Sequence, residues 1–170
     1  MPVKFIDDTS LEIALSRLAA KTPEIAEKAM RAGADIIADR MSANLREKVS
    51  GKLSRDAMGR LIASFGITPL LENSNGYWTM HIGFGGYDIT GVPFVLIARS
   101  FESGAVRGGR YTGSWRGKKR VMKAKSEIKG KYWRKPTHFA SKAVSSERVA
   151  ALYEIERVAE EEINRIFNGR

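Results

Sequence analysis

The sequence contains no cysteine, and this absence excludes several kinds of site at once. Without cysteine there is no disulfide framework, no thiolate zinc site, no iron–sulfur cluster and no cysteine nucleophile. The chain also lacks the run of about 18 apolar residues that a membrane-spanning helix requires. Its first residues become acidic at Asp7 and Asp8, where a secretory signal peptide would become apolar. We therefore expect no membrane span and a protein that is made in the cytoplasm.

Histidine is scarce, and no other residue pattern points to catalysis or metal binding. His81 and His138 are far apart in the sequence, and no cluster of histidines and carboxylates has ligand spacing. The acids Glu160–Glu162 occupy successive helical positions, so they point in different directions and do not form an acid–base pair. The glycines between 83 and 91 lack the spacing of a phosphate-binding loop, and no serine lies in a GxSxG turn. We expect no enzyme, no cofactor and no metal site.

Positive charge is what the chain has in excess, and it is concentrated in one segment. The formal net charge is +10, from 29 basic and 19 acidic residues. Residues 107–135 hold twelve basic residues and the single acid Glu127, a net charge of +11, whereas the remainder holds seventeen basic and eighteen acidic residues, a net of −1. The residues in this segment that we expect to contact a partner or a nucleic acid are Arg107, Arg110, Trp115, Arg116, Lys118, Lys119, Arg120, Lys123, Lys125 and Trp133.

Three interpretations of this basic segment follow from its composition. The first is nucleic-acid binding, in which the lysines and arginines contact phosphates and the aromatic rings stack on bases. A second interpretation is a solvated loop, and a third is an arm that reaches an acidic surface of a neighbouring subunit. Loops of this length are uncommon inside compact domains and are usually functional or disordered.

Hydrophobic spacing predicts long helices at the two ends of the chain. Apolar residues at helical spacing predict a short helix over 11–20, a break at Thr22-Pro23, and a second helix of about 23 residues that ends before Ser50-Gly51. A last helix is predicted from Ser146 to Phe167, with an apolar stripe formed by Val149, Leu152, Ile155, Ala159, Ile163 and Ile166.

Between these helices the pattern changes to strands and turns. Strands are predicted over 64–71 and over 77–84, joined by the turn Asn73–Gly76. Pro69 should place the first strand at the edge of a sheet or introduce a bulge in it. Residues 52–62 are predicted as a loop with at most one helical turn. For 92–101 we favour a short helix or turn that buries Phe94, Leu96, Ile97 and Phe101.

These elements predict an α+β fold. We expect a single domain over residues 1–170, in which a small antiparallel sheet packs against the long N-terminal helix and the C-terminal helix. A basic, glycine- and aromatic-containing extended arm over 105–135 is inserted before the C-terminal helix.

Four stretches of the chain carry a resemblance to a known family. They are the amphipathic helix at 26–39, the Gly-Arg-Leu entry into the first strand at 59–67, the segment 83–104 that ends in Phe-Glu-Ser-Gly, and the entry into the last helix at 135–143. In order and spacing they resemble the head–tail joining, or tail-completion, proteins of long-tailed bacteriophages.

The resemblance implies an α+β virion protein without catalytic activity. Such a protein is a neck or connector component, most commonly a six-membered ring, which joins the portal-side connector to the tail tube. It would be made in the cytoplasm of the host bacterium and would contact neighbouring neck, connector and tail proteins, as well as the DNA in the lumen without sequence preference. The alternative is a nucleic-acid-binding accessory protein that uses the 107–135 arm.

Overall fold

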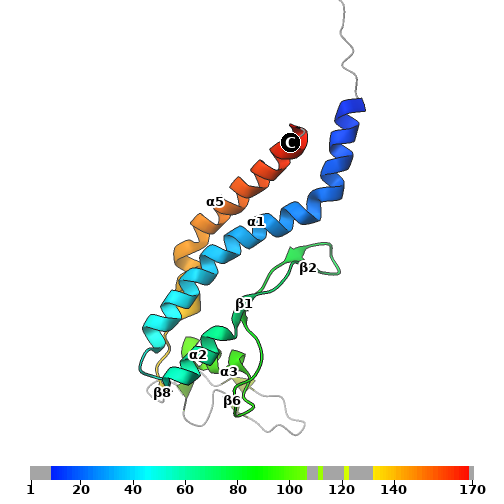
Figure 1. The fold of residues 1–170 in the computed structure, drawn as a ribbon. Coiled ribbons are helices and arrows are strands. Elements are labelled where there is room, and N and C mark those ends of the chain that lie inside the picture. The colour runs from blue at the N-terminus through cyan, green and yellow to red at the C-terminus, as the bar shows by residue number, and fades with distance from the viewer. Residues whose placement is uncertain (1–8, 107–110, 113–120, 123–131, 169–170) are drawn as a thin grey trace, which may run out of the picture. The chain divides into compact units, whose positions relative to one another are not determined.

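The computed structural model describes residues 9–106, 111–112, 121–122 and 132–168, and it has the predicted α+β class (Figure 1). A long helix begins the described chain and another ends it, as expected. The helices are α1 (Thr9–Val49), α2 (Arg55–Ala63), α3 (Phe94–Glu102) and α5 (Phe139–Phe167). The strands are β1 (Phe65–Ile67), β2 (Leu71–Glu72), β3 (Trp78–Thr79), β4 (Ile82–Phe84), β5 (Ala105–Val106), β6 (Tyr111–Thr112), β7 (Val121–Met122) and β8 (Tyr132–Arg134).

The strands of the described chain pair two by two: β1 with β4, β2 with β3, β5 with β8 and β6 with β7. The predicted hairpin is confirmed, because Leu71 pairs with Thr79 across the turn at Asn73–Gly76. The side-chain oxygen of Asn73 accepts hydrogen bonds from the backbone of Asn75 and Tyr77, both at 3.0 Å. The strand predicted over 64–71 is divided into β1 and β2 around Pro69, whose missing N–H prevents a continuous ladder.

The described chain forms two compact units, and both long helices contribute to each of them. The first unit comprises residues 1–37, 67–81 and 147–170. The second unit comprises residues 38–66 and 82–146.

In the first unit, α1 and α5 approach each other at Gly33. A Cβ atom at Gly33 would lie 2.5 Å from Cγ1 of Ile155 and 2.9 Å from the carbonyl oxygen of Ala151, so only glycine allows this approach. Ile25 and Ala29 are buried on the same side of α1, as the predicted stripe requires.

The predicted helix break at Thr22-Pro23 is wrong, because α1 runs through it. The Thr22 hydroxyl donates a hydrogen bond of 2.7 Å to the carbonyl oxygen of Leu18 instead of capping a new helix. Pro23 removes one backbone donor and crowds the preceding turn, which bends a helix without necessarily ending it. Figure 1 shows α1 changing direction in its first, blue part.

In the second unit, the core is formed by Leu45, Val49, Leu61, Phe101 and Phe139, all nearly inaccessible to solvent. The ring of Phe139 lies edge-on to that of Phe84, with centroids 6.2 Å apart. The loop predicted over 52–62 is wrong, since α2 occupies most of it. Its N-cap is Ser54, whose hydroxyl oxygen accepts a hydrogen bond from the N–H of Ala57, and Leu61 anchors it in the core.

The short helix favoured for 92–101 is confirmed as α3, with one correction to its buried face. Phe94 and Phe101 are buried as predicted, but Leu96 is 52% exposed and Ala98 is buried in its place. Positions 94, 98 and 101 share one side of a helix with 3.6 residues per turn, whereas position 96 lies on the other side.

The C-terminal helix is longer than predicted, and two residues of its predicted apolar stripe are exposed. It begins at Phe139 rather than near Ser146 and ends at Phe167, as expected. Val149 and Leu152 are exposed, contrary to the prediction, whereas Ala151 is buried. Ile155, Ala159, Ile163 and Ile166 are half-buried.

Candidate interaction site at the root of the basic segment

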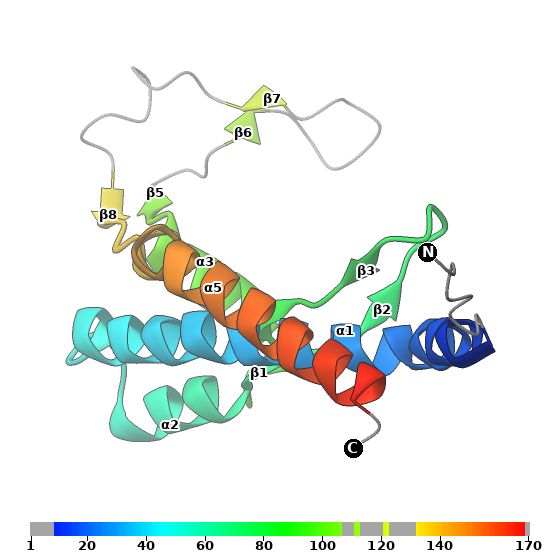
Figure 2. The ribbon, with the colours of Figure 1, turned by 90° about the horizontal axis from the view of Figure 1, so that it is seen from above.

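In the second unit, the basic segment is bounded along the chain by one pair of strands, β5 and β8. Ala105 in β5 pairs with Arg134 in β8, and Val106 pairs with Tyr132. Between them along the chain, β6 and β7 pair with each other, Tyr111 opposite Met122 (Figure 2). The β6–β7 pair therefore lies between β5 and β8 in the sequence, and we call the β5–β8 ladder the root of the segment.

Arg134 fixes this root to the core. Its guanidinium carbon lies 4.1 Å from the ring centroid of Phe101, and Nη1 donates a hydrogen bond of 2.7 Å to the hydroxyl of Ser100. Burial lowers the pKa of Arg134, which nevertheless stays charged at any physiological pH. Just beyond β8, the hydroxyl and the N–H of Thr137 both donate to the carbonyl oxygen of Phe101, at 3.0 and 2.9 Å. The last strand of the segment is therefore held to α3 by side-chain and backbone contacts together.

Gly104 makes the entry into β5 possible. Its φ angle is +73°, a conformation that side chains other than glycine rarely adopt. A Cβ atom there would lie 2.7 Å from the carbonyl oxygen of Arg134 and 2.9 Å from the nitrogen of Pro136. The two ends of the segment can lie this close only because residue 104 has no side chain.

Glu102 caps the N-terminus of α5. Its carboxylate accepts hydrogen bonds from the N–H of Ala140 at 2.8 Å, from the N–H of Ser141 at 3.1 Å and from the Ser141 hydroxyl. Burial alone would raise the pKa of Glu102, but the three hydrogen bonds and the nearby His138 outweigh it, so the pKa is lowered. An acid at this position also interacts favourably with the helix dipole.

Glu102 was missed by sequence reasoning, because its partners follow 38 and 39 residues later in the chain. The signal was present only in fragments. The stretch 101–104 and the entry into the last helix each stand out in the sequence, but nothing in the sequence shows that one caps the other. His138, which directly precedes α5, has a φ angle of +53°, and its N–H donates to the backbone oxygen of Glu102.

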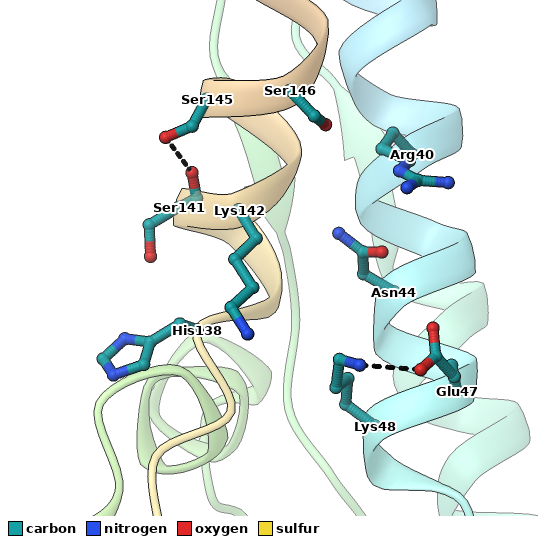
Figure 3. Close-up of a pocket in the computed structure, with 9 residues that line it drawn as sticks. All are labelled: Arg40, Asn44, Glu47, Lys48, His138, Ser141, Lys142, Ser145 and Ser146. Carbon is teal, nitrogen blue, oxygen red and sulfur yellow. Dashed lines mark hydrogen bonds and ion pairs between the residues drawn. The ribbon is translucent and has the colours of Figure 1, made fainter.

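An open groove of about 730 Å³ lies between α1 and the first turns of α5 in the same unit (Figure 3). Asn44 lines it and donates a buried hydrogen bond of 3.1 Å to the carbonyl oxygen of Phe139. Lys48 forms an ion pair of 2.6 Å with Glu47, and this hydrogen bond lowers the pKa of Glu47. The residues that line the groove are Arg40, Asn44, Glu47, Lys48, His138, Ser141, Lys142, Ser145 and Ser146.

The chemistry of this groove suits an anion. Its lining holds three basic residues, Arg40, Lys48 and Lys142, and one acid, Glu47, and the serine hydroxyls add hydrogen-bonding groups. Figure 3 shows the side chains of Asn44 and Lys142 extending into the space between the two helices. A phosphate or carboxylate group would find both charge and hydrogen-bond donors there.

Exposed apolar side chains gather around the start of α3. Ile89, at the tip of the loop that precedes this helix, is 79% exposed, and Tyr87, Val92 and Val95 are exposed as well. The loop is nevertheless tied down, because Arg60 Nε lies 3.0 Å from Asp88 Oδ1, and this hydrogen bond lowers the pKa of Asp88. An ordered apolar surface of this kind is typical of protein contacts.

Most of the predicted contact residues lie outside the described residues. They are Arg107, Arg110, Trp115, Arg116, Lys118, Lys119, Arg120, Lys123 and Lys125. The tenth, Trp133, lies in β8. Their role in binding stays a prediction.

Within the described part of the chain, no three or more metal-ligating side chains lie together. No helix there is long and apolar enough to cross a membrane.

Comparison of the chain with family models, with curated proteins and with solved structures found no match.

Proposed function

We propose that this chain is a structural protein of a tailed-bacteriophage virion. In this proposal it is a head–tail connector, or tail-completion, component of the neck, which forms a ring of six copies between the portal-side connector and the tail tube. Its partners are copies of itself and the neighbouring neck, connector and tail proteins. The symmetry rests on the sequence resemblance alone.

The positions of the resembling stretches support this proposal. The stretch at 59–67 leads from α2 directly into β1, and the stretch at 135–143 leads into α5 at Phe139. These are the entries into the first strand and the last helix that the resemblance implies. The stretch at 83–104 ends at the glycine that opens β5.

The observation that carries the proposal is the rooted basic segment. A segment with a net charge of +11 begins and ends in one strand ladder that Phe101, Arg134 and Gly104 fix to the core. Like charges at this density repel one another unless a counter-surface or solvent screens them. An arm held at its root and charged along its length is suited to binding a partner, and much less to filling a core.

A nucleic-acid-binding accessory protein is the second candidate. The groove lined by Arg40, Lys48 and Lys142 favours it, because this groove belongs to the same unit as the basic segment. Contacts from lysine and arginine to phosphates would bind DNA without reading its sequence. The same contacts in a neck would let the genome slide through the lumen.

Deletion of residues 108–131, with a short glycine turn in their place, tests the first candidate. Val106 and Tyr132 are paired, so a short turn closes the ladder without strain. We expect the shortened protein to stay folded with little change in melting temperature, while particles that carry it fail to join heads to tails. Infectious particles with normal necks would contradict the proposal, as would a particle reconstruction that places the protein away from the portal–tail axis.

Substitution of Lys118, Lys119 and Arg120 by alanine tests the second candidate. We expect the triple variant to bind DNA more weakly and with a smaller salt dependence in a mobility-shift titration. If the triple variant has lost DNA binding but still joins heads to tails normally, the two functions are separate.

A further inference from the structure

In the first unit, the side of α5 that faces away from α1 is unpartnered. Ala151 and Ile155 face α1, where Gly33 allows close approach. On the other side Val149 is 80% exposed and Tyr153 is 67% exposed, four residues apart on one helical face. Leu152 beside them is also exposed. An exposed valine, leucine and tyrosine on a long ordered helix form an apolar strip that no described residue covers.

Two acidic residues continue this strip, and both lack an ion-pair partner in the described part of the chain. Glu156 and Glu160 follow Val149 and Tyr153 on the same face, since each lies seven residues further along the helix. The other nearby acids are already neutralised. Arg157 forms ion pairs with Glu154 at 2.6 Å and Glu161 at 2.5 Å.

The two units differ strongly in charge. The first unit holds nine basic and thirteen acidic residues, a net charge of −4. The second holds twenty basic and six acidic residues, a net charge of +14. One copy of the chain therefore has an excess of acidic residues in one unit and an excess of basic residues in the other, and each is complementary in charge to the other unit of a second copy.

We propose that the α5 face formed by Val149, Leu152, Tyr153, Glu156 and Glu160 docks the basic unit of a second copy of this chain. Segment 107–131 of that copy supplies the cations for Glu156 and Glu160, and its aromatic residues meet the apolar strip. The two partners use different surfaces, so the contact is heterologous and repeats from copy to copy, as a ring requires. This inference rests on the proposed function for the closure of the ring, but the contact itself is tested separately.

Charge reversal on full-length protein tests this contact. The variant Glu156→Lys with Glu160→Lys is compared with Asp35→Lys with Glu72→Lys, which makes the same change of charge in the same unit at exposed positions away from the strip. Sedimentation velocity at low and high salt measures self-association. We expect the first variant to associate at least about tenfold more weakly at low salt, and the control to change by less than about threefold.

A second, compensating variant makes the test specific for the basic segment. The second variant carries Lys118→Glu, Lys119→Glu and Arg120→Glu and keeps the wild-type α5 face. Mixing it with the Glu156→Lys, Glu160→Lys variant should restore association. Tyr153→Ser should weaken association at high salt as well, because the apolar contact is not screened.

The outcomes separate this inference from the proposed function. Wild-type protein that stays monomeric at low salt and high concentration, or an equal response of both double variants, overturns the α5 contact and leaves the neck function standing. The α5 contact would also be overturned if the Glu156→Lys, Glu160→Lys variant bound DNA more tightly while its self-association stayed unchanged. The basic unit would then bind DNA and not a second copy. Restored association of the mixed variants, together with absence of the protein from the neck, would overturn the function and keep the contact.

Discussion

Substitution of Gly33 by alanine should destabilise the protein, although alanine is the better helix former. The added Cβ would lie 2.5 Å from Cγ1 and 2.7 Å from Cδ1 of Ile155, and 2.9 Å from the carbonyl oxygen of Ala151. The Ile155 side chain is able to rotate away at some cost. The carbonyl oxygen belongs to the backbone of α5, so it moves only if the two helices separate.

The magnitude follows from two opposing effects. Alanine in place of glycine inside a helix gains about 1 kcal/mol of helix propensity. Overpacking a close contact costs about 1–3 kcal/mol, and a contact with backbone belongs at the upper end of that range. We therefore expect a net loss of about 1–2 kcal/mol. For a chain of this length each kcal/mol lowers the melting temperature by about 2–4 °C.

Gly59→Ala is the matched control. Gly59 lies inside α2, and a Cβ atom there would meet no atom within 4 Å. This variant should gain up to about 1 kcal/mol, because only the propensity effect remains. Thermal unfolding followed by circular dichroism measures both variants. If Gly33→Ala were as stable as Gly59→Ala, the close approach of α1 and α5 would be wrong.

Two further changes probe the second unit and the root of the basic segment. Glu102→Gln should cost about 1 kcal/mol near neutral pH, because the α5 cap loses its charge. The pKa of Glu102 is lowered from its ordinary value of 4.5. The difference in unfolding free energy between wild type and variant should therefore be largest above pH 4.5 and should disappear as the pH falls through the folded-state pKa. Urea titrations between about pH 3 and 7 measure this difference. A gap that is independent of pH would contradict the cap. Leu45→Ala, in the core, should cost about 2–5 kcal/mol, whereas Leu15→Ala, exposed on the same helix, should cost less than about 1 kcal/mol in the same chemical denaturation assay.

The elements that the sequence predicted correctly are those encoded by neighbours along the chain. The turn at Asn73–Gly76 depends on the Asn73 side chain and a glycine within four residues. The apolar stripe of α1 appears in the spacing of Ile25, Ala29 and Gly33, and it is buried as expected. Local chemistry is sufficient for such elements, so one sequence is enough to find them.

The errors arose where distant parts of the chain decide the outcome. Pro23 ends an isolated helix, but here buried residues follow it directly in α1, and the helix bends instead. Leu96 and Val149 were expected in the core because they are apolar. Their exposure reflects which side of each helix meets its neighbours, and a short apolar run does not reveal this. The start of α5 was placed too late because its cap, Glu102, comes from the end of α3.

The distribution of charge between the units is also hidden in the sequence, and it narrows the kinds of assembly that the chain can form. Along the sequence only residues 107–135 stand out, yet without them the second unit still holds eight basic and five acidic residues, a net of +3 against −4 in the first unit. A two-fold dimer through the outer face of α5 would bring Glu156 and Glu160 of both copies into one contact, where like charges repel. Pairing acidic unit with basic unit avoids this repulsion and uses two different surfaces of each copy. If this pairing runs head to tail, each copy keeps one surface of each kind open, and the contact would continue until a ring closes or a fibre grows.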